Sequence, residues 1–380
     1  FPIIYGFLNQ YDSLQVFKIN KSFLGNEDPI NYAGVQDSTL FKDVNLNLVE
    51  IENGVEVASY PLQKMVLKNK ESGVFSNPEN VVYGAALPRV SGPSGTESIK
   101  FLKESKIGPS GEIETRITYE LRGTLNNDIN INSKVTPIPE YPADVFTQRS
   151  FQSKWKPNAI KGAISFATST GFTEGLLFDI ELPPFVKIAE LRMIFHYIDI
   201  DKNNVETIHT VEASLGEIVI PKVTEDRTKT AEFFIRSERF FELVKSAVPD
   251  FDETTLKQRI PSIVDFELVM ADEEYYYYRE NTLPSDDLNQ LKPQYSNINN
   301  GYGIFASRVK VLMTDWAIGT QPNINTIKSM PGLLLSKYTQ IALNKGFITA
   351  TDGSTIDIGT ADKRFCTDSD VTGILPTNCN

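Results

Sequence analysis

The chain has 380 residues, of which 41% are hydrophobic and 23% are charged, and its net charge is −12 at pH 7. This is the composition of an ordinary globular protein, and the length predicts two domains or three. An acidic surface repels phosphate, so nucleic acid is not expected as a partner, and the same charge gives no polybasic attraction to anionic lipid. No run of about 18 apolar residues is present, so no membrane-spanning helix is predicted.

Alternating apolar and polar residues predict strands through the N-terminal part of the chain. Residues 112–121 alternate between an apolar and a polar face, which is typical of a sheet with one buried and one wet side. Residues 44–48 alternate in the same way, and a phase slip at residues 49–51 predicts a β-bulge. Asn53 and Gly54 tolerate positive φ and predict a two-residue hairpin turn. Further strands are expected over residues 13–23, 55–62, 99–102, 159–167, 176–182, 191–199, 205–215, 262–270 and 303–313.

Three prolines between residues 137 and 142 predict a domain boundary. Short strands separated by turns predict an immunoglobulin-like β-sandwich over residues 1–140. Residues 141–317 are expected to form a second β-rich domain with helical insertions, and residues 318–380 a C-terminal appendage. The expected fold class is therefore mainly β, with an N-terminal immunoglobulin-like β-sandwich followed by a second β-rich domain with short helices.

Helices are predicted over residues 238–247, 253–259, 273–280 and 334–345. Ser237, Asp252 and Asp272 immediately precede the first three helices and are suited to cap their N-termini. Gly346 is expected to end the fourth helix, because glycine readily adopts the left-handed conformation found there.

Residues 301–306, Gly-Tyr-Gly-Ile-Phe-Ala, match the bare GxGxxA pattern of dinucleotide-binding turns. That site needs a strand before the glycines and a helix after them. Here a polar loop over residues 296–300 precedes the pattern, and residues 305–311 alternate like a strand. The pattern therefore predicts a loop that turns into a core strand, and no cofactor is expected.

Residues 199–204, Asp-Ile-Asp-Lys-Asn-Asn, resemble the first half of a calcium-binding loop, because oxygen ligands stand at alternate positions. The sixth position lacks the glycine that such a loop needs, and Thr210 stands where a bidentate glutamate belongs. An Asp- and Asn-rich hairpin tip explains the same residues, so no metal site is expected.

Four consecutive tyrosines, Tyr275, Tyr276, Tyr277 and Tyr278, are candidates for a platform that stacks on a sugar or a peptide. On a helix that begins after Asp272, Tyr275 and Tyr278 share one face, and burial in the core or in a domain contact is the alternative. Trp155 is a second candidate for ligand binding.

The two histidines, His196 and His209, lie on the two arms of a predicted hairpin, where they could be cross-strand neighbours. Neither has the spacing of a metal ligand, and no GxSxG elbow is present, so half-buried strand histidines are expected and no catalytic residue is assigned. The adjacent carboxylates Asp286–Asp287 and Glu273–Glu274 suit helix N-termini. A glycosidase dyad assembled in space is left open.

The chain begins at Phe1 without a methionine, as expected for an exported protein whose signal has been removed. Cys366 and Cys379 are spaced neither as a zinc pair nor as CxxC. We predict a disulfide between them that closes the C-terminal tail, with two free thiols in a reducing compartment as the alternative. A loop of that length stabilises by roughly 3 kcal/mol in the chain-entropy view.

Three segments carry a resemblance to a known family: residues 1–9 (FPIIYGFLN), 18–25 (KINKSFLG) and 295–308 (YSNINNGYGIFASR). Together they resemble a family of uncharacterised outer-membrane lipoproteins of Bacteroidetes. The resemblance covers residues 1–313, and its motifs are structural rather than catalytic. The C-terminal stretch that contains the two cysteines departs from the family pattern.

The resemblance implies a lipidated cysteine upstream of Phe1 and a lipid anchor in the outer membrane, with the body at the cell surface or on the periplasmic face. It also implies a TonB-dependent outer-membrane receptor as partner, and it supplies no catalytic residue. The expected function is thus a non-catalytic, membrane-anchored protein that assists nutrient uptake. A glycan-binding module is the alternative, and a hydrolase with a carboxylate site is a weaker one.

Overall fold

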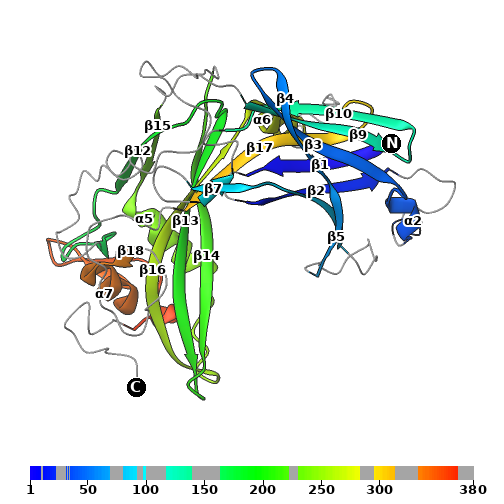
Figure 1. The fold of residues 1–380 in the computed structure, drawn as a ribbon. Coiled ribbons are helices and arrows are strands. Elements are labelled where there is room, and N and C mark those ends of the chain that lie inside the picture. The colour runs from blue at the N-terminus through cyan, green and yellow to red at the C-terminus, as the bar shows by residue number, and fades with distance from the viewer. Residues whose placement is uncertain are drawn as a thin grey trace, which may run out of the picture.

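The computed structural model describes residues 1–9, 12–22, 31, 33, 35–68, 80–91, 97–99, 117–138, 163–221, 230–282, 295–312 and 333–366. Within these residues the fold is mainly β, as the alternating patterns predict (Figure 1). The immunoglobulin-like topology remains a prediction. The described residues bury two separate hydrophobic cores, one in each of two units.

The first unit is built from two sheets that share one core. One layer contains, in spatial order, β1 (Pro2–Leu8), β2 (Leu14–Lys21), β6 (Asn80–Ala86) and β5 (Gln63–Leu67), and these strands form one end of a ten-stranded sheet that continues into the second unit. The facing sheet has the order β10 (Ile129–Val135), β9 (Ile117–Leu125), β3 (Val44–Glu52) and β4 (Val55–Pro61). Ile4 and Phe17 from one sheet pack with Leu48, Tyr119 and other residues of the facing sheet. Helix α2 (Gln36–Thr39) lies against β2, and β7 (Arg89–Ser91) pairs with β8 (Glu97–Ile99) as a separate two-stranded sheet.

The second unit is organised around two long strands. β13 (Ile188–Asp201) pairs with β14 (Glu206–Val219) on one side and with β16 (Leu256–Ala271) on the other. Its core is covered by α5 (Ser237–Ala247) and by the pair β12 (Leu176–Glu181) and β15 (Thr230–Ile235). The remaining elements are β11 (Ala163–Ile164), β18 (Leu333–Leu335), α7 (Lys337–Lys345), β19 (Phe347–Thr349), β20 (Thr355–Asp357) and the short helix Ala361–Lys363.

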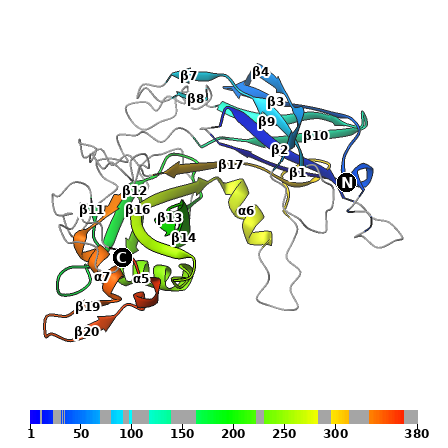
Figure 2. The same cartoon turned by 90° about the horizontal axis from the view of Figure 1, so that it is seen from below.

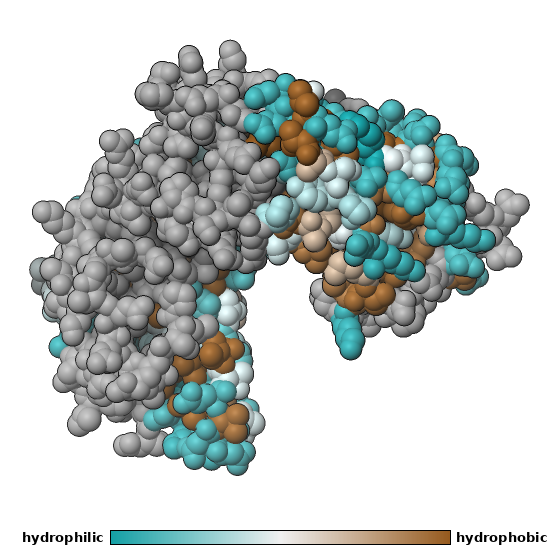
Figure 3. All heavy atoms as spheres, viewed as in Figure 1, coloured by the Kyte–Doolittle hydropathy of each residue, from teal (hydrophilic) through white to brown (hydrophobic). Residues whose placement is uncertain are grey.

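Strand β17 (Tyr302–Leu312) joins the two units, because its two halves have different partners. Residues 302–307 pair in parallel with β1, ending at Leu8 opposite Ser307. Residues 308–312 pair with β16 in the antiparallel sense, beginning at Arg308 opposite Ala271. Helix α6 (Glu273–Thr282) follows β16 directly and lies beside β17 at this junction (Figure 2). The molecule is hollowed between the β13–β14 hairpin and the first unit (Figure 3).

The domain division near residues 137–142 remains a prediction, since residues 139–142 lie outside the described part of the chain. Two features of the cores differ from the predicted domain bounds. Ile298 and Phe305, from far along the chain, pack into the first core. Leu343 and Phe365, expected in a separate appendage, pack into the second core.

Several predictions of turns, bulges and helix ends are confirmed by the structure. The turn at Asn53–Gly54 is confirmed by positive φ at both residues, and a register shift between Glu50 and Ile51 confirms the bulge. Gly346, with φ of 76°, ends α7 as expected. Asp272 caps α6, because its Oδ1 accepts the backbone N–H of Tyr275 at 3.0 Å.

Two capping predictions are wrong. Ser237 is the first residue of α5 rather than its cap, and its hydroxyl pairs with Thr173 inside the core. No helix follows Asp252, whose carboxylate accepts the N–H of Thr254 at 2.9 Å in a turn, and strand β16 starts at Leu256. The side-chain hydrogen bonds of an aspartate stabilise turns and helix starts alike, so this local signal did not separate the two.

Candidate ligand-binding groove

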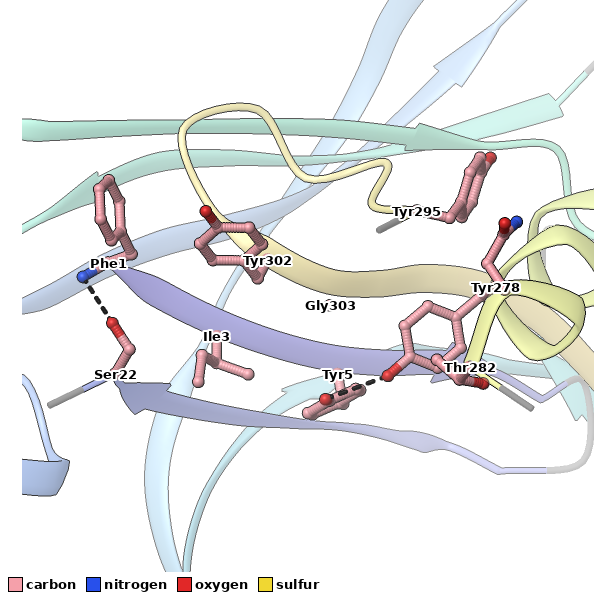
Figure 4. A pocket seen from close by; sticks show the side chains of 10 residues that line it. Phe1, Ile3, Tyr5, Ser22, Tyr278, Thr282, Tyr295, Tyr302 and Gly303 are labelled. Atoms are coloured by element: carbon pink, nitrogen blue, oxygen red, sulfur yellow. Dashed lines mark hydrogen bonds between the residues drawn. The ribbon is translucent and has the colours of Figure 1, made fainter. Parts of the chain in front are cut away.

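A surface cavity of about 470 Å³ opens at the N-terminal ends of β1 and β17, beside the C-terminal end of α6. Five of its ten lining residues are aromatic, and they come from the N-terminal segment and from residues 278–302 (Figure 4). The lining residues are Phe1, Ile3, Tyr5, Ser22, Tyr278, Asn281, Thr282, Tyr295, Tyr302 and Gly303. We call this feature the aromatic groove.

The floor of the aromatic groove is the outer face of the β1–β17 pair. In β1, Ile4 points into the first core while Ile3 and Tyr5 point outward, because side chains alternate along a strand. Gly303 lies opposite Ile4 in the register, at φ of +104°. A Cβ at Gly303 would stand 2.0 Å from the carbonyl oxygen of Ile4. Glycine is therefore required here for the two strands to pair.

Pairs of aromatic rings form the walls of the groove. The rings of Phe1 and Tyr302 meet edge to face, with centroids 5.7 Å apart, and those of Tyr5 and Tyr278 meet in the same way at 6.0 Å. The hydroxyl of Tyr278 donates to that of Tyr5 at 3.1 Å. Phe1 is 72% exposed, Tyr302 42% and Tyr5 38%. These rings thus present apolar surface to solvent while their mutual contacts hold them in place.

The polar side chains that line the groove are neutral, and the charged group among its lining residues is the α-ammonium of Phe1, which donates to the Ser22 hydroxyl at 2.9 Å. Asn281 Nδ2 donates to the carbonyl of Tyr277 at 2.7 Å, and the Thr282 hydroxyl donates to the carbonyl of Arg279 at 3.0 Å. Burial, together with the hydrogen bond to Tyr5, raises the pKa of Tyr278. Burial, together with a hydrogen bond to Glu274, raises the pKa of Tyr295. The phenols of Tyr278 and Tyr295 therefore stay protonated at neutral pH.

Of the four consecutive tyrosines, only Tyr278 lines the aromatic groove. Tyr275 packs edge-on against Phe7 at 5.9 Å, and Lys187 lies over the ring of Tyr276 at 5.2 Å. Tyr277 is exposed and donates to Glu273 at 2.9 Å. The four rings point in different directions around a helix, so together they do not form a flat platform.

The structure adds four aromatic residues that the sequence did not single out: Phe1, Tyr5, Tyr295 and Tyr302. Each is one ring in an otherwise ordinary strand or loop, and their grouping depends on the β1–β17 pairing. Trp155 lies outside the described residues. The carboxylates Asp286 and Asp287 also lie outside them.

The histidines are not cross-strand neighbours, because His196 stands opposite Thr210 and His209 opposite Tyr197, which places them on opposite faces of the hairpin. His196 Nε2 lies 3.0 Å from Asp265 Oδ2, and the pair is buried. His209 stacks on Tyr197, with centroids 4.9 Å apart. Each histidine thus has its own carboxylate or ring partner within the sheet.

The residues of the calcium-like motif serve the hairpin instead. Asp199 receives a two-pronged ion pair from Arg259, with Nε–Oδ1 at 2.7 Å and Nη2–Oδ2 at 2.9 Å. Asp201 Oδ1 accepts the N–H groups of Asn203 and Val205, both at 2.8 Å, in a turn. Among the described residues, no three His, Cys, Asp or Glu side chains are grouped as metal ligands.

The glycine pattern at residues 301–306 opens strand β17, and no helix follows it. Cys366 is buried and disulfide-bonded. Cys379 lies outside the described residues, so the pairing of these two cysteines remains a prediction. In the described part of the chain, no helix is long and apolar enough to cross a membrane.

Comparison with known proteins returned no match, either to a family model or to a curated protein sequence.

Proposed function

We propose that the protein is a non-catalytic binding protein that holds a neutral carbohydrate in the aromatic groove. The observation that carries this proposal is the gathering of Phe1, Tyr5, Tyr278, Tyr295 and Tyr302 around one cavity whose lining side chains carry no charge. Sugar rings have apolar C–H faces and a rim of hydroxyls. Aromatic side chains with polar tips offer a matching surface.

The size and chemistry of the groove fit this ligand class. Its volume of about 470 Å³ is within the ordinary range of small-ligand sites, roughly 300–1,000 Å³. The tyrosine hydroxyls, Asn281 and Thr282 supply neutral donors and acceptors for sugar hydroxyls. No Lys or Arg is present among the lining residues to pair with a phosphate or a carboxylate.

The cellular setting is a further part of the proposal and rests on the resemblance to outer-membrane lipoproteins. On that basis the protein is anchored at the outer membrane and captures a glycan for a TonB-dependent receptor. Affinity purification of the lipidated protein from outer membranes is expected to recover such a receptor. Recovery of the protein without a receptor, in repeated preparations that retain the anchor, would contradict this part.

A glycan array tests the ligand class. We expect the wild-type protein to bind a set of neutral oligosaccharides in preference to sulfated or uronic-acid glycans. The Tyr302→Ala variant is expected to lose these signals, whereas Tyr338→Ala, which removes a tyrosine of similar exposure (42%) from α7, should keep them. Binding confined to acidic glycans, or binding that survives Tyr302→Ala unchanged, would overturn the proposal.

A further inference from the structure

Helix α6 contacts both units of the molecule. It follows β16 of the second unit and lies alongside β17, which pairs with β1 of the first unit (Figure 2). Residues three apart lie on the same side of a helix. One side of α6 can therefore contact the first unit while a neighbouring side contacts the second.

One side of α6 is attached to the first unit. Tyr275 packs against Phe7, with ring centroids 5.9 Å apart. One turn later, Tyr278 contacts Tyr5 through both its ring, at 6.0 Å, and its hydroxyl, at 3.1 Å. Both contacts are made with the outer face of β1, and the second of them forms part of the aromatic groove.

The neighbouring side of α6 is attached to the second unit. Arg279 forms a two-pronged ion pair with Glu217 of β14, with the Nη2–Oε1 distance at 2.8 Å. The ring of Tyr276 lies beneath the ammonium group of Lys187, which in turn donates to the carbonyl of Pro221 at 3.1 Å. Residues 276 and 279 therefore hold the helix to the second unit, just as residues 275 and 278 hold it to the first.

We propose that helix α6 couples the aromatic groove to the angle between the two units, with Arg279 as a positioning residue for the groove. Tyr278, Asn281 and Thr282 line the groove from α6, so a ligand that contacts them biases the position of the helix. Because α6 is attached to β1 through Tyr278 and to β14 through Arg279, a change in the position of the helix also moves Glu217 and the long β13–β14 hairpin. Binding and inter-unit geometry must then influence one another reciprocally.

A distance measurement tests the coupling without any ligand. Spin labels at Val55→Cys in the first unit and Lys202→Cys at the tip of the β13–β14 hairpin report on the inter-unit distance; both positions are exposed. Tyr278→Ala removes the contact between α6 and Tyr5, which belongs to the first unit. We expect it nevertheless to shift the most populated inter-label distance by more than about 2 Å, or to broaden its distribution by that amount.

Matched variants separate coupling from general damage. Tyr278→Phe keeps the ring contact and should retain the parent distance, as should Tyr338→Ala on α7. Where Tyr278→Ala does not fold, Tyr5→Ala removes the same ring contact from the side of the sheet and takes its place. A Tyr278→Ala protein that folds and keeps the parent distance overturns the proposal.

The reciprocal experiment rests on the proposed function, since it needs a glycan ligand. With the neutral oligosaccharide that binds most tightly on the array, Arg279→Gln is expected to weaken binding by about fivefold or more, although Arg279 does not line the groove. Arg239→Gln removes an exposed ion pair within one helix, Arg239–Glu242 on α5, and should leave binding unchanged. Equal affinities of Arg279→Gln and wild type would overturn the coupling. If the wild type binds no glycan, the proposed function is overturned, and the distance measurement alone decides the coupling.

Discussion

Asp272 and Ser307 are joined by two hydrogen bonds at the residue where β17 changes its partner from β1 to β16. Asp272 Oδ2 accepts the N–H of Ser307 at 2.7 Å, and Asp272 N–H donates to the carbonyl of Ser307 at 3.1 Å. The hydroxyl of Ser307 also accepts the N–H of Ile138 at 3.0 Å, just beyond the last strand of the first unit. Asp272 and Ser307 together thus connect the start of α6, β17 and the residues that follow β10.

The buried position of Asp272 predicts a dependence of stability on pH. Desolvation by burial, reinforced by the nearby Glu274, raises the pKa of Asp272 from 3.8 to about 7, against the opposing effect of the N–H donors. Between these values the folded protein binds a proton that the unfolded chain has released, so the free energy of unfolding falls as pH rises. The stabilisation from this group is complete below about pH 4 and lost above about pH 7.

Urea unfolding of wild type and Asp272→Asn at pH 5 and at pH 8 checks this sign. Asp272→Asn removes the titration and keeps a side chain suited to the helix cap, but its amide has one acceptor oxygen for the two N–H donors of Tyr275 and Ser307, which costs about 1–3 kcal/mol at any pH. The stability of the wild type should therefore fall more between pH 5 and pH 8 than that of the variant. Parallel pH dependences of the two proteins would show that Asp272 does not titrate in this range.

The buried ion pair between Arg259 and Asp199 predicts a large loss of stability when one partner is removed. Arg259 is 1% exposed and also donates to the carbonyl of Pro249 at 2.7 Å. Asp199→Ala leaves the guanidinium buried without its carboxylate, a change that destabilises by about 3–5 kcal/mol. Urea unfolding measures it.

The control for this prediction is the exposed ion pair between Arg364 and Glu253, whose side chains are 50% and 64% exposed. Exposed pairs contribute about 0–1 kcal/mol, so Glu253→Ala should change stability little. Equal effects of Asp199→Ala and Glu253→Ala would contradict the structural role of the buried pair.

Substitution of Gly303 tests whether the pairing of β1 and β17, which forms the groove floor, requires a glycine. Gly303→Ala combines an unfavourable φ of +104° with a Cβ only 2.0 Å from a backbone oxygen, so we expect a loss of more than about 2 kcal/mol in the free energy of unfolding. Gly353→Ala shares a positive φ of +85° but has no atom within 4 Å of the added Cβ. Its loss should stay near 1 kcal/mol. If the thermal unfolding curves of the two variants coincide, this account of Gly303 is contradicted.

The strands and turns were predictable from sequence where the signal is local. The Asn53–Gly54 turn, the bulge near Glu50 and the cap at Asp272 each depend on a few adjacent residues, and all three are confirmed. Asp252 shows the limit of local reasoning. Its side chain suits a helix start, but the pairing of the following residues with β13 made them a strand.

The aromatic groove was not predictable from sequence in the same way. It depends on Tyr5 and Tyr302 lying in neighbouring strands, which requires β1 to pair with a strand about 300 residues later in the chain. Alternation shows that each strand has an outer face but carries no information on its partner. The run of tyrosines at residues 275–278 did mark the correct helix, yet only Tyr278 faces the groove.

The predicted disulfide is checked by intact mass. Unreduced protein treated with a thiol-alkylating reagent under denaturing conditions should gain no label, and reduction should allow two. Because a disulfide restricts the unfolded chain, reduction is expected to lower stability by roughly 3 kcal/mol. Labelling of both cysteines without reduction would contradict the predicted bond.

The central claim is that the aromatic groove binds a neutral glycan, and titration calorimetry with groove variants tests it most directly. The ligand is the neutral oligosaccharide with the strongest array signal, titrated into wild type, Tyr302→Ala and Tyr338→Ala. We predict that Tyr302→Ala raises the dissociation constant at least tenfold, or about 1.4 kcal/mol, while Tyr338→Ala binds like wild type. Equal dissociation constants for wild type and Tyr302→Ala, or no heat of binding from the wild type, would contradict the claim.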